Sequence, residues 1–103
     1  MDLIDGIKNI NFHDAEILNI NCDYINETAN IKIKLSYENA IVILECNKFK
    51  EIVVNNKSPW GEGFYVVYLD IQKGNFIRIE ILLNSGDKIY IEAESISLIK
   101  DEV

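Results

Sequence analysis

The clearest candidate for acid–base chemistry is a histidine followed directly by an aspartate. His13 is the only histidine of the chain, and Asp14 comes next. An imidazole titrates near neutral pH, so such a pair suits general acid–base catalysis. Adjacent residues of a strand point to opposite faces, however, so Asp14 is not expected to orient the ring of His13. We therefore favour a structural role, in which His13 binds backbone where a strand begins and Asp14 closes a turn.

A tryptophan loop is the candidate for binding. Residues 55–63 hold the only Pro, the only Trp (Trp60), two glycines and Glu62. Loops carry function disproportionately, and Trp is a favoured interface anchor. The favoured alternative is a Trp60 ring packed onto the second half of the chain, because Trp is highly buried on average. Trp60 and Glu62, together with His13 and Asp14, are the candidate binding residues.

Other chemical equipment is sparse. The chain has one histidine and two cysteines, so no His/Cys cluster offers three or four metal ligands. It also lacks a glycine-rich phosphate loop. We expect no metal, no cofactor and no enzymatic activity.

The region around the histidine resembles a known group of proteins. The run Phe12-His13-Asp14-Ala15, followed by Ile17, is similar to the N-terminal motif of small bacterial β-rich proteins. Some of these are immunity proteins of toxin systems, such as the immunity protein 50 family. The resemblance implies a binding protein that masks a basic toxin, and it transfers no catalytic residue.

The second half of the chain predicts a strand meander. Residues 76–83 alternate so that one face is apolar throughout, which indicates a strand. A three-residue loop at 84–86, with Gly86 in the left-handed conformation, keeps apolar residues opposite one another. A two-residue loop would place the apolar face against the polar one. The predicted pairs are Leu83 with Asp87, Ile81 with Ile89, Ile79 with Ile91 and Ile77 with Ala93.

The preceding loop is placed by Gly74 as its third residue. This register puts Tyr68 opposite Arg78, which predicts a cation–π pair. The outer face is unusually apolar, so we expect the N-terminal segment, the middle connection or another chain to cover it. The inward pairs are Leu69 with Ile77, Val67 with Ile79 and Tyr65 with Ile81, and the apolar outer residues include Phe64, Val66, Phe76, Leu82 and Tyr90.

The first half predicts a second meander over residues 16–46. Residues 40–44 are apolar on both faces, so this strand is expected to be central or covered twice. Cys22 and Cys46 would flank a shared middle strand, roughly 9–10 Å apart. A disulfide needs α-carbons within about 7 Å, so two free, buried thiols are predicted. Loops at Glu27-Thr28 and Glu38-Asn39 pair Tyr24 with Ile31, Cys22 with Ile33, Ile20 with Leu35, Leu18 with Tyr37, Leu35 with Val42, Ile33 with Leu44 and Ile31 with Cys46, and set Lys32 opposite Glu45.

These patterns predict one all-β domain over residues 1–103. Two three-stranded antiparallel meanders, 15–46 and 64–94, would pack apolar face to apolar face as a sandwich or a partly open barrel. Residues 1–12 fit either a helix or an extended edge strand that covers apolar surface. The connection 47–63 is the least regular part, with a short strand or one to two helical turns between Phe49 and Val54. The C-terminus fits a strand extension or a late edge strand.

The net charge of the chain limits the class of partner that it is expected to bind. The 17 acidic and 10 basic residues give a net charge of −7. Nucleic-acid binding is not expected, because it needs clustered Lys and Arg. An acidic surface suits a basic protein partner, or serves solubility alone. No long apolar run or basic leader is present, so we expect no membrane span and a cytoplasmic protein. The alternatives are a small ligand held in a barrel mouth, or a homo-oligomer formed by apolar outer strands.

Overall fold

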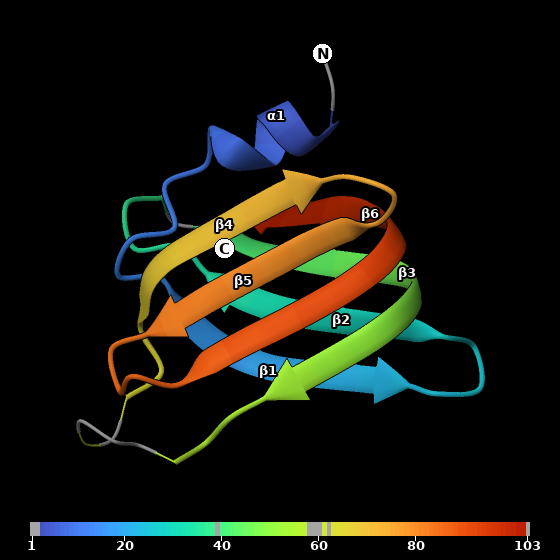
Figure 1. Ribbon diagram of the computed structural model, residues 1–103. Coiled ribbons are helices and arrows are strands. Elements are labelled where there is room, and N and C mark those ends of the chain that lie inside the picture. Colours follow the sequence, from blue (N-terminus) through green and yellow to red (C-terminus); the bar gives the residue numbers. More distant parts are fainter. Residues whose placement is uncertain (1–2, 39, 58–60, 62, 103) are drawn as a thin grey trace.

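The computed structural model describes residues 3–38, 40–57, 61 and 63–102. These residues form one antiparallel sheet in the order β1-β2-β3-β6-β5-β4 and one short helix (Figure 1). The prediction of an all-β protein is confirmed. The elements are α1 (Leu3–Lys8), β1 (Glu16–Asp23), β2 (Thr28–Lys34), β3 (Ala40–Val54), β4 (Val66–Lys73), β5 (Ile77–Leu83) and β6 (Lys88–Glu102).

The two predicted meanders belong to a single sheet. Strands β3 and β6, 15 residues each, pair with each other from Ala40↔Glu102 to Val54↔Ile89. This long pairing, which alternation alone does not predict, joins β1–β3 to β4–β6. Residues 47–54 are therefore the second half of β3, so of the two alternatives for Phe49–Val54 the strand is the one observed. The alternative of a strand extension at the C-terminus is confirmed.

The sheet bends so that its inner face encloses one core. Lys48 has a φ of 53°, and a bulge follows between Phe49 and Glu51. Such irregularities bend a strand, and beyond this point the inward positions of β3 change from even-numbered residues to Phe49 and Ile52. In Figure 1, β4, β5 and the first half of β6 consequently lie in front of β1 and β2. The core draws on both meanders and includes Ile31, Ile33, Val42, Leu44, Ile71, Ile79, Ile81, Ile89 and Ile91.

The two outermost strands of the order meet at one end. Glu16 of β1 forms an isolated bridge with Tyr65, just before β4, and the Ile17 N–H donates to the Phe64 carbonyl at 2.9 Å. The open sheet is therefore closer to the predicted partly open barrel than to a sandwich of two sheets. Helix α1 packs against β4 and β6, and its Ile7 is fully buried. Of the two alternatives for residues 1–12, the helix is the one observed.

The register of β5 and β6 follows the prediction. The pairs Ile77↔Ala93, Ile79↔Ile91 and Ile81↔Ile89 are all present, and the Leu83 N–H donates to the Asp87 carbonyl at 2.9 Å. Gly86 has a φ of 90°, a conformation that glycine adopts without steric cost. Turn chemistry and alternation agree at this hairpin, and together they were sufficient to predict its register.

The register of β4 and β5 was predicted wrongly. The loop occupies residues 74–76, so Ile79 faces Ile71 and Ile81 faces Leu69. A bulge between Val66 and Tyr68 then turns Val66 inward. As a result Tyr65 and Val67, both predicted to face the core, are exposed. The predicted pair of Tyr68 with Arg78 is wrong as well, because these residues lie opposite Leu82 and Gln72.

The first meander was also placed in a shifted register. The β1–β2 loop spans residues 24–27, where the Asp23 carboxylate accepts the Asn26 N–H at 3.2 Å. Tyr24 lies in this loop and is 83% exposed. The β2–β3 register shifts by two, which preserves the inward faces. The observed pairs include Ile20↔Ile31, Ile17↔Ile33, Ile33↔Val42 and Ile31↔Leu44, and Lys32 faces Ile43 rather than Glu45.

The cysteines flank β2, as predicted, although through other pairs. Cys22 and Cys46 both lie opposite Ala29, on either side of it, and both are free thiols. Cys46 is fully buried, and desolvation raises the pKa of its thiol to about 12. Cys22 is exposed, so the prediction of burial is wrong for it. The core does not extend beneath the end of β1, which is exposed along most of its length.

Candidate binding site

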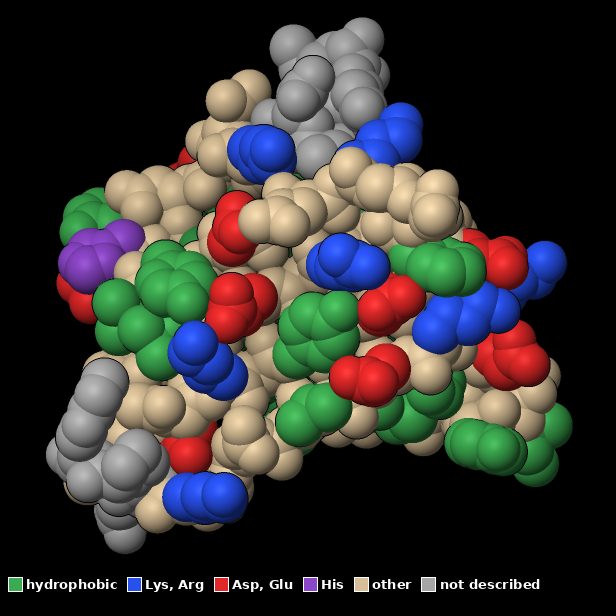
Figure 2. Space-filling view, in the orientation of Figure 1, with side chains coloured by type: hydrophobic (Ala, Val, Ile, Leu, Met, Phe, Trp, Pro, Cys, Tyr) green, Lys and Arg blue, Asp and Glu red, His purple; other side chains and the backbone are tan. Residues whose placement is uncertain are grey.

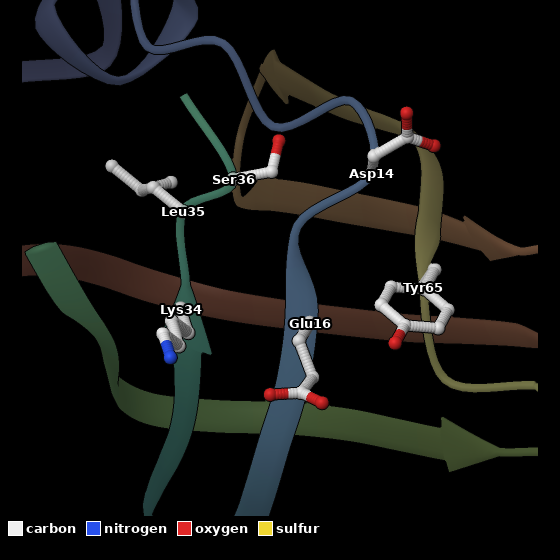
Figure 3. A pocket seen from close by; sticks show the side chains of 6 residues that line it. All are labelled: Asp14, Glu16, Lys34, Leu35, Ser36 and Tyr65. Carbon is white, nitrogen blue, oxygen red and sulfur yellow. The ribbon is translucent and has the colours of Figure 1, made fainter. Parts of the chain in front are cut away.

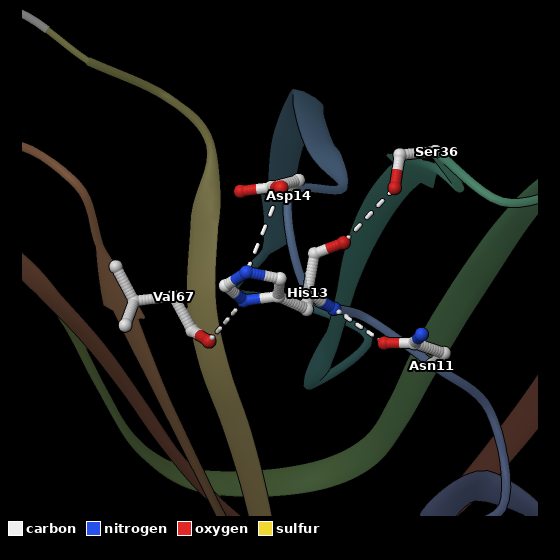
Figure 4. Close-up of polar contacts among 5 residues, drawn as sticks. All are labelled: Asn11, His13, Asp14, Ser36 and Val67. Carbon is white, nitrogen blue, oxygen red and sulfur yellow. Dashed lines mark hydrogen bonds and ion pairs between the residues drawn. The ribbon is translucent and has the colours of Figure 1, made fainter.

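A tight turn precedes β1 and contains the histidine–aspartate pair (Figure 4). The Ala15 N–H donates to the Phe12 carbonyl at 3.0 Å, and Asp14 takes the left-handed conformation with a φ of 62°. The Asn11 side chain accepts the His13 N–H at 3.0 Å, and the Ser36 hydroxyl donates to the His13 carbonyl at 2.9 Å. Asp14 therefore closes a turn, as the structural interpretation expected.

The same turn fastens β1 to β4. The Asp14 N–H donates to the Val66 carbonyl at 2.8 Å, and the Val66 N–H donates to the Ala15 carbonyl at 2.8 Å. The His13 ring lies with Nδ1 3.2 Å from the Val67 carbonyl and Nε2 3.5 Å from the Asp14 carboxylate. Asp14 thus does face the ring of His13, contrary to prediction, because the pair lies in a turn and not in a strand. We call this junction of β1 and β4 the seam.

A shallow depression of about 300 Å³ lies at the seam (Figure 3). Glu16 and Lys34 are cross-strand partners, and the Glu16 carboxylate lies between Lys34 and Tyr65 in the view. Within the described part of the chain, neither a hydrogen bond nor an ion pair engages the Glu16 carboxylate. The depression therefore offers an unpaired negative charge beside an aromatic ring. It is lined by Asp14, Glu16, Lys34, Leu35, Ser36 and Tyr65.

Exposed apolar side chains adjoin this depression. We call Phe64, Tyr65, Val67 and Tyr68 the seam patch; these side chains are between 38% and 49% exposed. The rings of Phe64 and Tyr65 stack with their centroids 4.9 Å apart. Figure 2 shows hydrophobic side chains gathered beside the single histidine. Sequence reasoning placed Phe64 and Tyr68 on the outer face but put Tyr65 and Val67 inside, because no local signal indicated the bulge that turns Val66 inward.

The outer face of β4–β6 is a network of paired charges, which we call the charge ladder. Arg78 approaches Glu92 at 3.7 Å, and the Tyr90 hydroxyl donates to the same carboxylate at 3.1 Å. Lys88 approaches Glu80 at 3.1 Å, and this hydrogen bond raises the pKa of Lys88. Helix α1 packs at the β4 side of this face rather than over it, and residues 47–54 form a strand of the sheet (Figure 1), while part of the middle connection 47–63 lies outside the described residues. Alternating acids and bases make the face compatible with water (Figure 2).

Two candidate residues, Trp60 and Glu62, lie outside the described residues. The structure brings the other two, His13 and Asp14, together at the seam. Among the described side chains, no group of three His, Cys, Asp or Glu residues is placed to hold a metal ion. No described helix has the length and apolar character needed to cross a membrane.

Comparison with known proteins gives a match of fold. No protein-family model and no curated protein matches the chain. Its fold is similar to the crystal structure of an uncharacterised protein from Neisseria gonorrhoeae, with a TM-score of 0.64. The match covers 85% of this chain and 92% of that chain, at 16% sequence identity. At this identity the likeness confirms the antiparallel all-β fold and extends no further.

Proposed function

We propose that this is a small cytoplasmic binding protein that receives a basic protein partner at the seam, in the manner of a bacterial immunity protein. The observation that carries the proposal is the seam patch beside the unpaired Glu16 carboxylate. Aromatic residues are enriched at protein interfaces, and complementary charge steers a partner into place.

The patch is held in a fixed position. Tyr65 is bound on both backbone groups by Asn84, whose Oδ1 accepts its N–H at 3.2 Å and whose N–H donates to its carbonyl at 2.9 Å. The next residue, Val66, is bound on both groups by the turn that holds Asp14. A surface that is ordered before binding loses less conformational entropy when a partner arrives.

The charges support a basic partner. The chain carries a net charge of −7. On the charge ladder the carboxylates of Glu80 and Glu92 already have cations beside them. At the seam Lys34 lies opposite Glu16 on β2, but among the described residues the Glu16 carboxylate makes no ion pair, so a Lys or Arg from outside meets less competition there. The free thiols Cys22 and Cys46 fit a reducing compartment.

The environment of His13 favours binding over catalysis. One ring nitrogen faces the Val67 carbonyl, and the other faces the Asp14 carboxylate. The Nδ1 contact joins the turn to the segment that leads into β4, and Nε2 lies beside the carboxylate of its own neighbour in the turn, so the ring has a structural role at the junction.

The test is a titration with the protein encoded immediately upstream of this gene, which the proposal expects to be basic. We expect calorimetry to show binding that weakens as salt rises from 50 to 200 mM. Tyr65→Ala and Glu16→Gln should each weaken it about tenfold or more, the range of an interface anchor. Tyr24→Ala and Glu51→Gln, which change an exposed tyrosine in the β1–β2 loop and an exposed acid on β3, are the matched controls.

Two results would contradict the proposal. The first is the absence of a basic neighbour together with no binding by any protein recovered with the tagged chain. The second is a complex that the seam variants and the control variants weaken equally.

A further inference from the structure

The turn between β5 and β6, residues 84–87, binds backbone outside its own hairpin. The Asp87 carboxylate accepts the Lys57 N–H at 2.7 Å. Asn84 accepts the Tyr65 N–H with its side chain at 3.2 Å and donates its own N–H to the Tyr65 carbonyl at 2.9 Å. The turn therefore holds two points of the chain between β3 and β4, and the second of these points belongs to the seam patch.

The turn is itself fixed by buried hydrogen bonds. Ser85 and Asp87 are 1% and 4% exposed. The Ser85 hydroxyl donates to the Asp87 carboxylate at 2.9 Å, and the Asp87 N–H donates to the Ser85 Oγ at 3.3 Å. Buried polar groups in folded proteins nearly always have partners, and these two residues supply partners to each other. Asn84 therefore extends from a turn that is ordered together with the core.

Gly63 lies directly against the Asn84 side chain. A Cβ atom added to Gly63 would overlap that side chain, whose Oδ1, Cγ and Nδ2 are the three nearest atoms. The φ angle of Gly63 is outside the left-handed region, so this position needs space rather than conformational freedom. Any side chain at position 63 would displace the Asn84 amide from the Tyr65 N–H.

The seam patch depends on where these contacts place Tyr65. Its ring stacks on Phe64 and lines the depression beside Glu16 (Figure 3). The flanking residues Phe64 and Val66 are bound to β1 and to the turn at Asp14, whereas Tyr65 itself is bound by Asn84. Loss of the Asn84 contact should therefore loosen Tyr65 without detaching β4.

We propose that Asn84 and Gly63 are positioning residues of the seam, which hold Tyr65 in the orientation that a partner meets. Asn84 supplies the contact, and Gly63 leaves the space for it. Contact residues keep their geometry when neighbouring residues fix them before binding. The orientation of Tyr65 can be measured without a partner, whereas its effect on binding rests on the proposed function.

NMR spectroscopy of the free, full chain tests the positioning. Asn84→Ala and Gly63→Ala should each raise the solvent-exchange rate of the Tyr65 amide about threefold to tenfold, which corresponds to the loss of one hydrogen bond. The nuclear Overhauser contacts between the Phe64 and Tyr65 rings should weaken in both variants. Asn84→Asp keeps an oxygen acceptor and should retain most of the protection.

Two further variants distinguish this role from general destabilisation, and thermal unfolding shows that each chain remains folded. Gly74→Ala is the matched control, because its Cβ would meet only the Phe76 carbonyl oxygen at 3.8 Å. Adding Gly63→Ala to Asn84→Ala should raise the exchange of Tyr65 no further, because the displaced amide is already absent. Unchanged exchange in Asn84→Ala would overturn the proposal, and so would a double variant in which the two increases combine in full.

Titration with the partner adds a readout that a purely structural role would not change. Asn84→Ala should weaken binding about threefold to tenfold in the natural chain and have little effect in a Tyr65→Ala background. Asn84→Asp should restore the affinity. Equal losses in both backgrounds would show that Asn84 does not act through Tyr65 and would overturn its positioning role. Failure to bind any partner contradicts the proposed function alone, because the exchange rates decide the positioning of Tyr65 by themselves.

Discussion

The charge ladder and the seam lie on the same small molecule and treat their charges in opposite ways. On the ladder, Arg78 and Lys88 each lie beside a carboxylate of the adjacent strand. At the seam, Glu16 makes no ion pair with any described residue and lies beside exposed aromatic rings. A surface that satisfies its own charges gains little from a partner, whereas one that does not can gain. The difference locates the expected interface on the seam.

The charge ladder and the seam both lie over one hydrophobic core, and unfolding measurements can test this. Ile33→Ala in the first meander and Ile79→Ala in the second each remove a side chain that is at most 1% exposed. We expect each to lower the free energy of unfolding by about 2–5 kcal/mol in a single transition, measured by urea unfolding with circular dichroism. Two separate transitions would show that the meanders are independent units and that the comparison concerns two domains.

The buried thiol gives a pH test of the same core. The pKa of Cys46 is raised from 9.0 to about 12, so the folded state keeps a proton that the unfolded state releases. The contribution of the protonated thiol to the free energy of unfolding is fully present below pH 9. It decreases as the pH rises toward 12, by at most about 1.4 kcal/mol per pH unit. Urea unfolding between pH 8 and 10.5 should show a shallower decline for Cys46→Ala than for the natural chain. Equal slopes would mean that the thiol is not desolvated.

The seam can be weakened at its turn without touching the ladder. Asp14→Val places a branched side chain at a φ of 62° and should cost about 1–2 kcal/mol, while Asp14→Gly should keep or raise stability. The Val66 amide, which the turn binds, should exchange faster in the valine variant. Loss of protection spread evenly over β4–β6 would instead show that the seam and the ladder are one mechanical unit.

The ladder is expected to give the smallest effect. Arg78 is well exposed, and surface ion pairs contribute about 0–1 kcal/mol. Arg78→Ala should therefore change the free energy of unfolding by less than about 1 kcal/mol and leave partner binding unchanged. A double-mutant cycle with Glu92→Gln measures the pair. A large loss of binding in Arg78→Ala would move the interface from the seam to the ladder.

Local signals in the sequence determined how much could be predicted. Alternation and Gly86 fixed the β5–β6 register, because the turn and the strands agreed. The position of Gly74 led to a wrong register for β4 and β5, because the loop is 74–76 and the glycine is its first residue rather than its third. The seam was beyond local reasoning, because His13 and Val67 are 54 residues apart. The pairing of β3 with β6 was also beyond local reasoning, because alternation indicates a strand but not the strand with which it pairs.

The seam also has a consequence for the kinetics of folding. Hairpins such as β5–β6 close short loops and form within microseconds, whereas contacts between distant residues must first overcome loop-closure entropy. The bonds between the turn at Asp14 and Val66 close one of the long loops of this chain. We expect substitutions in the turn to accelerate unfolding and leave the refolding rate nearly unchanged, while substitutions in the β5–β6 turn slow refolding. Stopped-flow chevrons would distinguish the effects of these two sets of substitutions. We expect β1 and β4, which meet at the seam, to be the last strands to be joined.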